Sequence, residues 1–182
     1  MNVLGVVGSP RRGGNTHLLV SKALEGAREK GASTELVLLG DLDIRECDGC
    51  HACWKGRPCP KADAMNALYP KIAAAGALVL GTPVYWYGPT ALMKAFIDRF
   101  VYFNAPPHRA EVRGKRAALL IPFEDGDRAT AKPVVDFFRR SLRYLEMEVA
   151  GALLIPGVTR RGEVARKPDV LRKALRIGRS LA

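Results

Sequence analysis

Five short apolar runs alternate with longer segments of helical periodicity, and this alternation constrains the fold more than any other feature of the chain. Their length and their content of Val, Leu, Ile and Ala are typical of buried strands. Strands that alternate with helices form a parallel sheet covered on both faces, joined by right-handed crossovers. The runs are Val3–Val7, Glu35–Leu39, Ala77–Leu80, Ala117–Ile121 and Val149–Ile155.

Helices are expected between and after these strands, where apolar residues recur at intervals of three or four. Pro70 falls inside the second expected helix and predicts a kink or a restart at that point. The expected helices cover His17–Lys30, Ala62–Ala75, Thr90–Phe103, Lys132–Leu145 and Pro168–Leu181.

The pattern predicts an α/β fold of the flavodoxin-like type, a three-layer sandwich around a five-stranded parallel sheet of order 2-1-3-4-5. We expect a single domain over residues 1–182, with a cysteine-rich loop at 47–59. Ligands of such folds bind outside the carboxyl ends of the strands, beside the switch point. The segments Gly8–Thr16, Gly81–Thr90 and Pro122–Asp127 each follow a strand and should meet there.

The first of these segments has the composition of an anion-binding turn. Its glycines let the backbone approach an anion, and Ser9, Arg11, Asn15 and Thr16 add donors or charge at the start of a helix. An ordinary turn also uses Ser, Gly and Asn. The segment lacks both the P-loop ending and the G-x-G-x-x-G spacing, so it predicts a phosphate ligand other than ATP or NAD.

The second segment contains three consecutive aromatic residues, Tyr85, Trp86 and Tyr87, between prolines and glycines. Aromatic faces stack on a flat ring, and loop N–H groups pair with its polar edge. The alternatives are a plug at the end of the sheet and a subunit contact. A phosphate site beside a planar-ring site predicts a phosphorylated flavin, FMN.

All four cysteines, Cys47, Cys50, Cys53 and Cys59, fall within one short window. Such clustering is more typical of a metal or redox site than of a disulfide framework.

The chain has no apolar stretch of transmembrane length and no secretory leader pattern, so we expect a soluble, cytoplasmic protein without membrane contact.

Lys and Arg outnumber Asp and Glu by 29 to 18, for a net charge of +11. Much of the excess lies in the C-terminal segment. We interpret it as a solvated helix face or as attraction for phosphorylated cofactors; nucleic-acid binding is not favoured, because no aromatic residues interleave with these charges.

With these motifs the chain resembles the NADPH-dependent FMN reductase and iron–sulfur flavoprotein group. The resemblance implies that Ser9, Arg11, Gly14, Asn15 and Thr16 form the FMN phosphate site. It also implies that Pro83, Val84, Tyr85 and Trp86 border the ribityl chain and the isoalloxazine. The motifs that carry it are Gly8-Ser9-Pro10-Arg11 with Gly14-Asn15-Thr16, Cys47-Asp48-Gly49-Cys50-His51-Ala52-Cys53, and Gly81-Thr82-Pro83-Val84-Tyr85-Trp86 followed by Lys94, Ile97, Asp98 and Arg99.

The spacing Cys47-x2-Cys50-x2-Cys53-x5-Cys59 resembles the cluster motif of iron–sulfur flavoproteins, and four thiolates are the normal complement of a [4Fe–4S] cluster. Zinc, disulfides and packed apolar thiols remain open for the same residues.

The resemblance implies an FMN-dependent oxidoreductase that accepts hydride from NAD(P)H and passes electrons to a flavin, a quinone or another acceptor. No catalytic side chain is expected, because the flavin performs the redox chemistry. The alternatives are an electron carrier fed by ferredoxin through the cluster, and a non-enzymatic, metal-stabilised nucleic-acid adaptor. A homodimer or homotetramer is expected. Lys94, Asp98 and Arg99 are expected as packing or ion-pair residues, and Glu124, Asp125 and Asp127 of the third loop as solvated groups.

Overall fold

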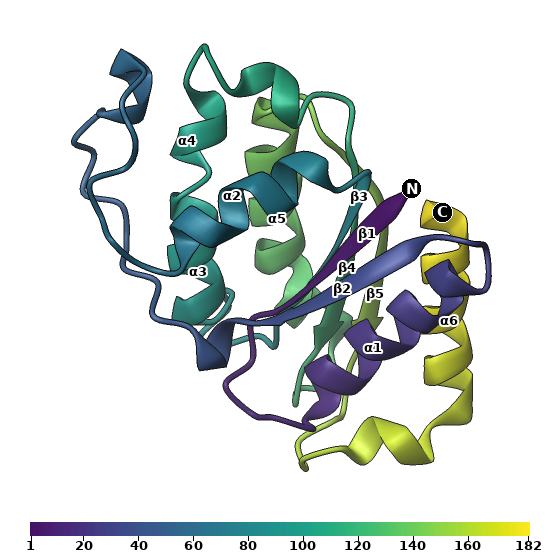
Figure 1. Ribbon diagram of the computed structural model, residues 1–182. Helices are drawn as coiled ribbons and strands as arrows, with labels where there is room; N and C mark the ends of the chain where they lie inside the picture. The colour runs from purple at the N-terminus through teal and green to yellow at the C-terminus, as the bar shows by residue number, and fades with distance from the viewer.

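The computed structural model describes residues 1–182, in which a five-stranded sheet lies between two layers of helices (Figure 1). The strands are β1 (Asn2–Val7), β2 (Ser33–Leu38), β3 (Ala77–Gly81), β4 (Arg116–Pro122) and β5 (Glu148–Ile155). All neighbours are parallel and the order is β2-β1-β3-β4-β5. The predicted fold class and strand order are confirmed.

Two helices cover one face of the sheet and the other helices cover the opposite face (Figure 1). The first pair is α1 (Asn15–Arg28) and α6 (Pro168–Leu181). The second layer contains α2 (Met65–Ala74), α3 (Ala91–Asp98), α4 (Val101–Asn104) and α5 (Lys132–Tyr144). Short 3₁₀ turns complete the chain at Leu39–Asp41 (η1), Cys53–Lys55 (η2), Arg109–Glu111 (η3), Arg128–Ala131 (η4) and Glu163–Arg166 (η5). None of the helices combines the length and the apolar character that a membrane span requires.

The core forms because successive strand residues point to opposite faces of the sheet. Leu4 and Val6 of β1 pack against the layer that contains α2, α3 and α5, whereas Val3 and Val7 pack under α1 and α6. The central strands β1, β3 and β4 are almost wholly buried, and the edge strands are partly exposed. This burial on both faces explains the continuous apolar runs in the sequence.

The predicted helix over Thr90–Phe103 is wrong as a single helix, because the structure divides it into α3 and α4. The hydrogen bonding tightens at the junction, where the Phe100 N–H donates to the Ile97 carbonyl three residues back. The break falls at Arg99 and Phe100, between α3 and α4. The Arg99 side chain is 1% exposed and belongs to a buried polar network. Across Pro70, in contrast, α2 continues to Ala74 without a restart.

Candidate cofactor site

The turn between β1 and α1 has the donors that an anion requires. The N–H groups of Asn15, Thr16 and His17, in the first turn of α1, have no hydrogen-bond acceptor within the chain. The Ser9 and Thr16 side chains are buried beside them. Unpaired N–H groups at the positive end of a helix, with two hydroxyls, are a suitable donor set for a phosphate.

Close backbone packing holds this turn against the second loop. The Gly8 N–H donates to the Gly81 carbonyl over 2.8 Å. A Cβ on Gly8 would lie 2.7 Å from the Met93 Cβ, so only glycine fits where the turn crosses α3. The first two predicted segments therefore meet at one edge of the sheet.

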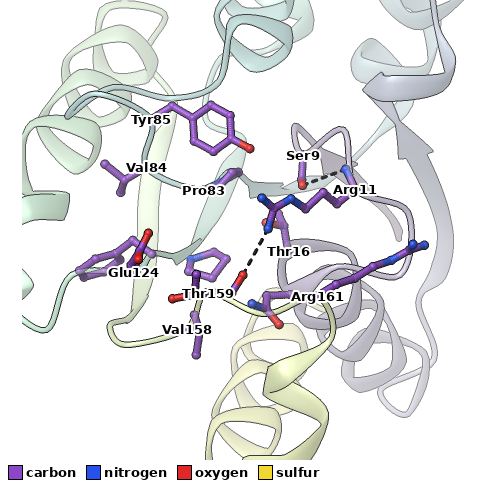
Figure 2. Close-up of a pocket in the computed structure, with 13 residues that line it drawn as sticks. Ser9, Arg11, Thr16, Pro83, Val84, Tyr85, Glu124, Val158, Thr159 and Arg161 are labelled. Carbon is purple, nitrogen blue, oxygen red and sulfur yellow. Dashed lines mark hydrogen bonds between the residues drawn. The ribbon is translucent and has the colours of Figure 1, made fainter.

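A cavity opens at that edge, and Figure 2 shows its lining side chains. Its volume is about 120 Å³, so a tricyclic ring would extend from it over the open rim. All three segments that were expected to converge contribute to the lining. The lining residues are Ser9, Arg11, Asn15, Thr16, Pro83, Val84, Tyr85, Pro122, Phe123, Glu124, Val158, Thr159 and Arg161.

Two residues that were predicted to bind the cofactor lie outside this lining. Gly14 is the N-cap residue of α1 and receives no side-chain cap. Trp86 is 97% exposed, and with Tyr87 it forms the centre of a tight turn closed by two hydrogen bonds of 2.9 Å between Tyr85 and Gly88. The φ angles of Trp86 and Tyr87 are +46° and +60°, as expected at the centre of such a turn, and the Trp86 side chain points into solvent.

The acidic residues of the third loop are exposed, as expected, and two of them also accept hydrogen bonds within the loop. Only Glu124 of its three acidic residues lines the cavity. The Asp125 carboxylate accepts hydrogen bonds from the Asp127 N–H and the Thr130 hydroxyl, and these donors lower the pKa of Asp125. Asp127 in turn caps η4 by accepting from the Ala129 N–H. Two of the three carboxylates thus shape the loop.

The fourth side of the cavity is formed by a segment that sequence reasoning missed. Val158, Thr159 and Arg161 follow β5 and line the cavity opposite Val84 and Tyr85 (Figure 2). Val158 and Thr159 were not singled out in the sequence, and Arg161 counted only as part of the basic C-terminal segment. Their position directly after the fifth parallel strand, between Gly157 and Gly162, is the signal that would have found them.

The cysteine loop projects beside α4, on the side of the sheet that carries α2 to α5 (Figure 1). All four thiols are free: Cys53 is buried, Cys50 is exposed, and Cys47 and Cys59 are intermediate. Burial raises the pKa of the Cys53 thiol. No three His, Cys, Asp or Glu side chains come together as a group able to hold a single metal ion.

Cys59 belongs to a hydrogen-bond network around the buried Arg99 side chain. The Arg99 guanidinium donates to the Asp63 carboxylate over 2.6 Å and to the Cys59 Sγ over 3.2 Å. The expectation that Arg99 is an ion-pair residue is confirmed, and Lys94 and Asp98 form a separate exposed pair at 2.6 Å.

Together, the fold and the cavity define a doubly wound α/β protein with a cavity, lined by hydroxyl, guanidinium and aromatic side chains, at the carboxyl edge of its sheet. The model of the NADPH-dependent FMN reductase family matches residues 1–156. The chain belongs to this family, and FMN is therefore its cofactor and FMN-dependent oxidoreduction its class of chemistry. The predicted family, cofactor and class of enzyme are confirmed.

Comparison with individual proteins finds similar iron–sulfur flavoproteins and a solved structure with the same fold. An iron–sulfur flavoprotein of Archaeoglobus fulgidus is 30% identical over 100% of this chain and 79% of its own length. An iron–sulfur flavoprotein of Methanocaldococcus jannaschii is 40% identical over 99 residues, 54% of this chain and 51% of that protein, so this match spans about half of the relative. The solved structure of the Trp repressor binding protein from Bacillus subtilis has the same fold, with a TM-score of 0.74, 24% identity and coverage of 97% and 98% of the two chains.

Proposed function

We propose that this chain holds FMN in the cavity at the carboxyl edge of the sheet and uses it to carry electrons from NAD(P)H to a small-molecule acceptor. The observation that carries this proposal is that the anion-binding turn and the aromatic loop line one cavity in a chain of this family. Bound FMN supplies the hydride and electron chemistry. The protein's own tasks are to anchor the FMN phosphate, to orient the flavin ring and to limit access to it.

The phosphate is assigned to the start of α1. The free N–H groups of residues 15–17, the hydroxyls of Ser9 and Thr16, and the Arg11 guanidinium supply neutral and charged donors. Charge-assisted hydrogen bonds are roughly twice as strong as neutral ones, so Arg11 is expected to contribute most per residue.

The flavin ring is assigned to the rim formed by the second and third loops. Pro83, Val84 and Tyr85 supply the apolar and aromatic surface, and Glu124 supplies one carboxylate on the side that faces them. We assign the aromatic contact to Tyr85 rather than to Trp86, because the Trp86 side chain points into solvent.

The test of the phosphate assignment is the affinity for FMN and for riboflavin, measured by quenching of flavin fluorescence. Replacing Arg11 by Ala and Thr16 by Val should weaken FMN binding by about a hundredfold or more and leave riboflavin binding nearly unchanged. The matched control is Arg28→Ala with Thr34→Val, which makes the same changes at the far end of α1 and in the neighbouring strand β2. Unchanged FMN retention in the Arg11 and Thr16 variant would refute the assignment.

The electron donor is tested by anaerobic bleaching of the flavin absorbance. Either NADPH or NADH should reduce the FMN-loaded protein with saturation kinetics, and a difference between them would identify the preferred donor. If neither nucleotide bleaches the flavin while dithionite does, the hydride-transfer proposal fails and the FMN assignment is unaffected.

A second candidate is an electron carrier with an iron–sulfur cluster, which the four cysteines and the names of the relatives favour. Analysis of iron and acid-labile sulfide in protein purified without oxygen distinguishes the two candidate functions: about four of each per chain would support the electron carrier.

A homodimer or homotetramer remains part of the proposal, and sedimentation equilibrium of the FMN-loaded protein tests it.

A further inference from the structure

The loop Gly157–Gly162 lies beyond the part of the chain that the family model matches, which ends at residue 156. It nevertheless supplies Val158, Thr159 and Arg161 to the cofactor cavity. This side of the cavity is therefore a property of this chain that the family match does not describe.

Two hydrogen bonds join this loop, and a third joins the η5 turn that follows it, to the turn between β1 and α1, here called the phosphate turn (residues 8–16). The Arg11 guanidinium donates to the Thr159 carbonyl over 3.2 Å, as Figure 2 shows. The Asn15 side chain donates to the Arg160 carbonyl over 3.0 Å and accepts from the Val164 N–H over 3.1 Å. The two polar atoms of the Asn15 side chain are thus used by the loop and by the η5 turn that follows it, which makes Asn15 a positioning residue for this segment.

Further contacts fix the conformation of the loop itself. One carboxylate oxygen of Glu163 accepts the N–H groups of Thr159 and Arg160, both over 3.0 Å. At the start of the loop, the Val158 N–H donates to the Phe123 carbonyl over 3.0 Å. Gly157 and Gly162 have φ angles of +66° and +70°, which glycine adopts without strain. The loop therefore has a defined conformation, and residues 157–162 form a wall of the cavity.

We propose that this wall closes the phosphate end of the cavity and makes the site selective for a flavin that ends in a phosphate monoester. A flavin with an adenylate on that phosphate, FAD, needs an exit between the phosphate turn and the neighbouring loop. The hydrogen bonds from Arg11 and Asn15 lie across that exit. The selectivity is produced by exclusion of the larger ligand, and it rests on the proposed binding of FMN.

The experiment measures dissociation constants for FMN, FAD and riboflavin by fluorescence quenching. The wild-type chain should bind FMN about a hundredfold more tightly than FAD. Glu163→Ala and Asn15→Ala loosen the wall from its two sides. Each should reduce the FMN-to-FAD preference about tenfold, mainly through tighter FAD binding, without changing riboflavin binding. The control is Glu29→Ala, which removes an exposed carboxylate paired with Arg179 at the far end of α1 and should leave the preference unchanged.

Equal affinity of the wild-type chain for FMN and FAD would overturn the proposal, as would an unchanged preference in both wall variants. Riboflavin binding shows in every variant that the ring site is intact. A chain that binds none of the three flavins would instead overturn the proposed function, so the two failures are distinguishable.

Discussion

The Arg99 guanidinium and the Asp63 carboxylate form an ion pair of 2.6 Å in which the two side chains are 1% and 0% exposed. The same guanidinium donates to the Arg45 carbonyl over 2.9 Å and to the Cys59 Sγ over 3.2 Å. Arg45 precedes the cysteine loop, and Asp63 follows it. A single side chain at the end of α3 therefore fastens both ends of that loop to the helical layer.

Removal of one partner of this pair should be costly. Asp63→Ala leaves a buried guanidinium without its counter-ion, and we expect the free energy of unfolding to fall by about 3–5 kcal/mol. Urea unfolding followed by circular dichroism measures it. The control is Asp98→Ala, which breaks an exposed pair of the same 2.6 Å length and should cost about 0–1 kcal/mol. Similar losses in the two variants would show that burial does not amplify the Asp63 interaction.

The same pair predicts how stability depends on pH. Burial alone would raise the pKa of Asp63, but hydrogen bonds from Arg99 and from the N–H groups of Arg45 and Met65 outweigh burial and lower it. A carboxyl with a lower pKa in the folded state contributes stability above its unfolded pKa and loses that contribution as pH falls through the folded pKa. The stability advantage of wild type over Asp63→Asn should therefore be full above about pH 5 and shrink below about pH 4. Parallel stability curves for the two proteins would contradict this account.

The strands could be predicted from the sequence because burial on both faces of a parallel sheet leaves an unmistakable apolar run. Val3–Val7 and Ala77–Leu80 were located to within one residue of β1 and β3. Three walls of the cavity followed from the same reasoning, since loops after parallel strands share one edge. The fourth wall was not predicted, although its place after β5 indicated it. Its hydrogen bonds to Arg11 and Asn15 use backbone carbonyls that any sequence carries, so no residue of the wall marked these contacts.

The break between α3 and α4 was missed for a related reason. Helical periodicity continues across Arg99, and an arginine in that pattern is expected on the surface. Its burial depends on Asp63, which lies 36 positions away and precedes α2. Patterns within one element predict that element, whereas a buried ion pair depends on two elements at once.

The contact between α1 and α6 gives a third prediction. A Cβ on Gly178 would lie 1.7 Å from the Ala23 carbonyl oxygen, and the contact is with backbone that cannot move aside cheaply. Gly178→Ala should therefore separate the helices and lower the free energy of unfolding by at least about 1–3 kcal/mol. Gly151→Ala in β5 is the matched control, because nothing lies within 4 Å of its added Cβ. Thermal unfolding of both variants measures the effect, and equal melting temperatures would contradict the close packing.

Thr90 links the first two walls of the cavity. Its hydroxyl donates to the Gly8 carbonyl and accepts the Met93 N–H over 3.2 Å, which caps α3, and its own N–H donates to the Thr82 hydroxyl over 3.2 Å. Thr90→Val keeps the shape and removes both hydroxyl interactions. We expect the free energy of unfolding to fall by about 1–3 kcal/mol and FMN affinity to fall severalfold, because the phosphate turn is no longer fastened to the ring loop.

Thr90→Ser provides the control, because it retains the hydroxyl and loses only a methyl group. Serine should restore most of the FMN affinity that valine removes, as judged by fluorescence titration at a temperature where all three proteins are folded. If serine weakens FMN binding as much as valine does, the methyl group contributes to the spacing of the two loops as much as the hydroxyl link does. If neither substitution changes the affinity, the phosphate turn keeps its place through the Gly8–Gly81 backbone hydrogen bond alone.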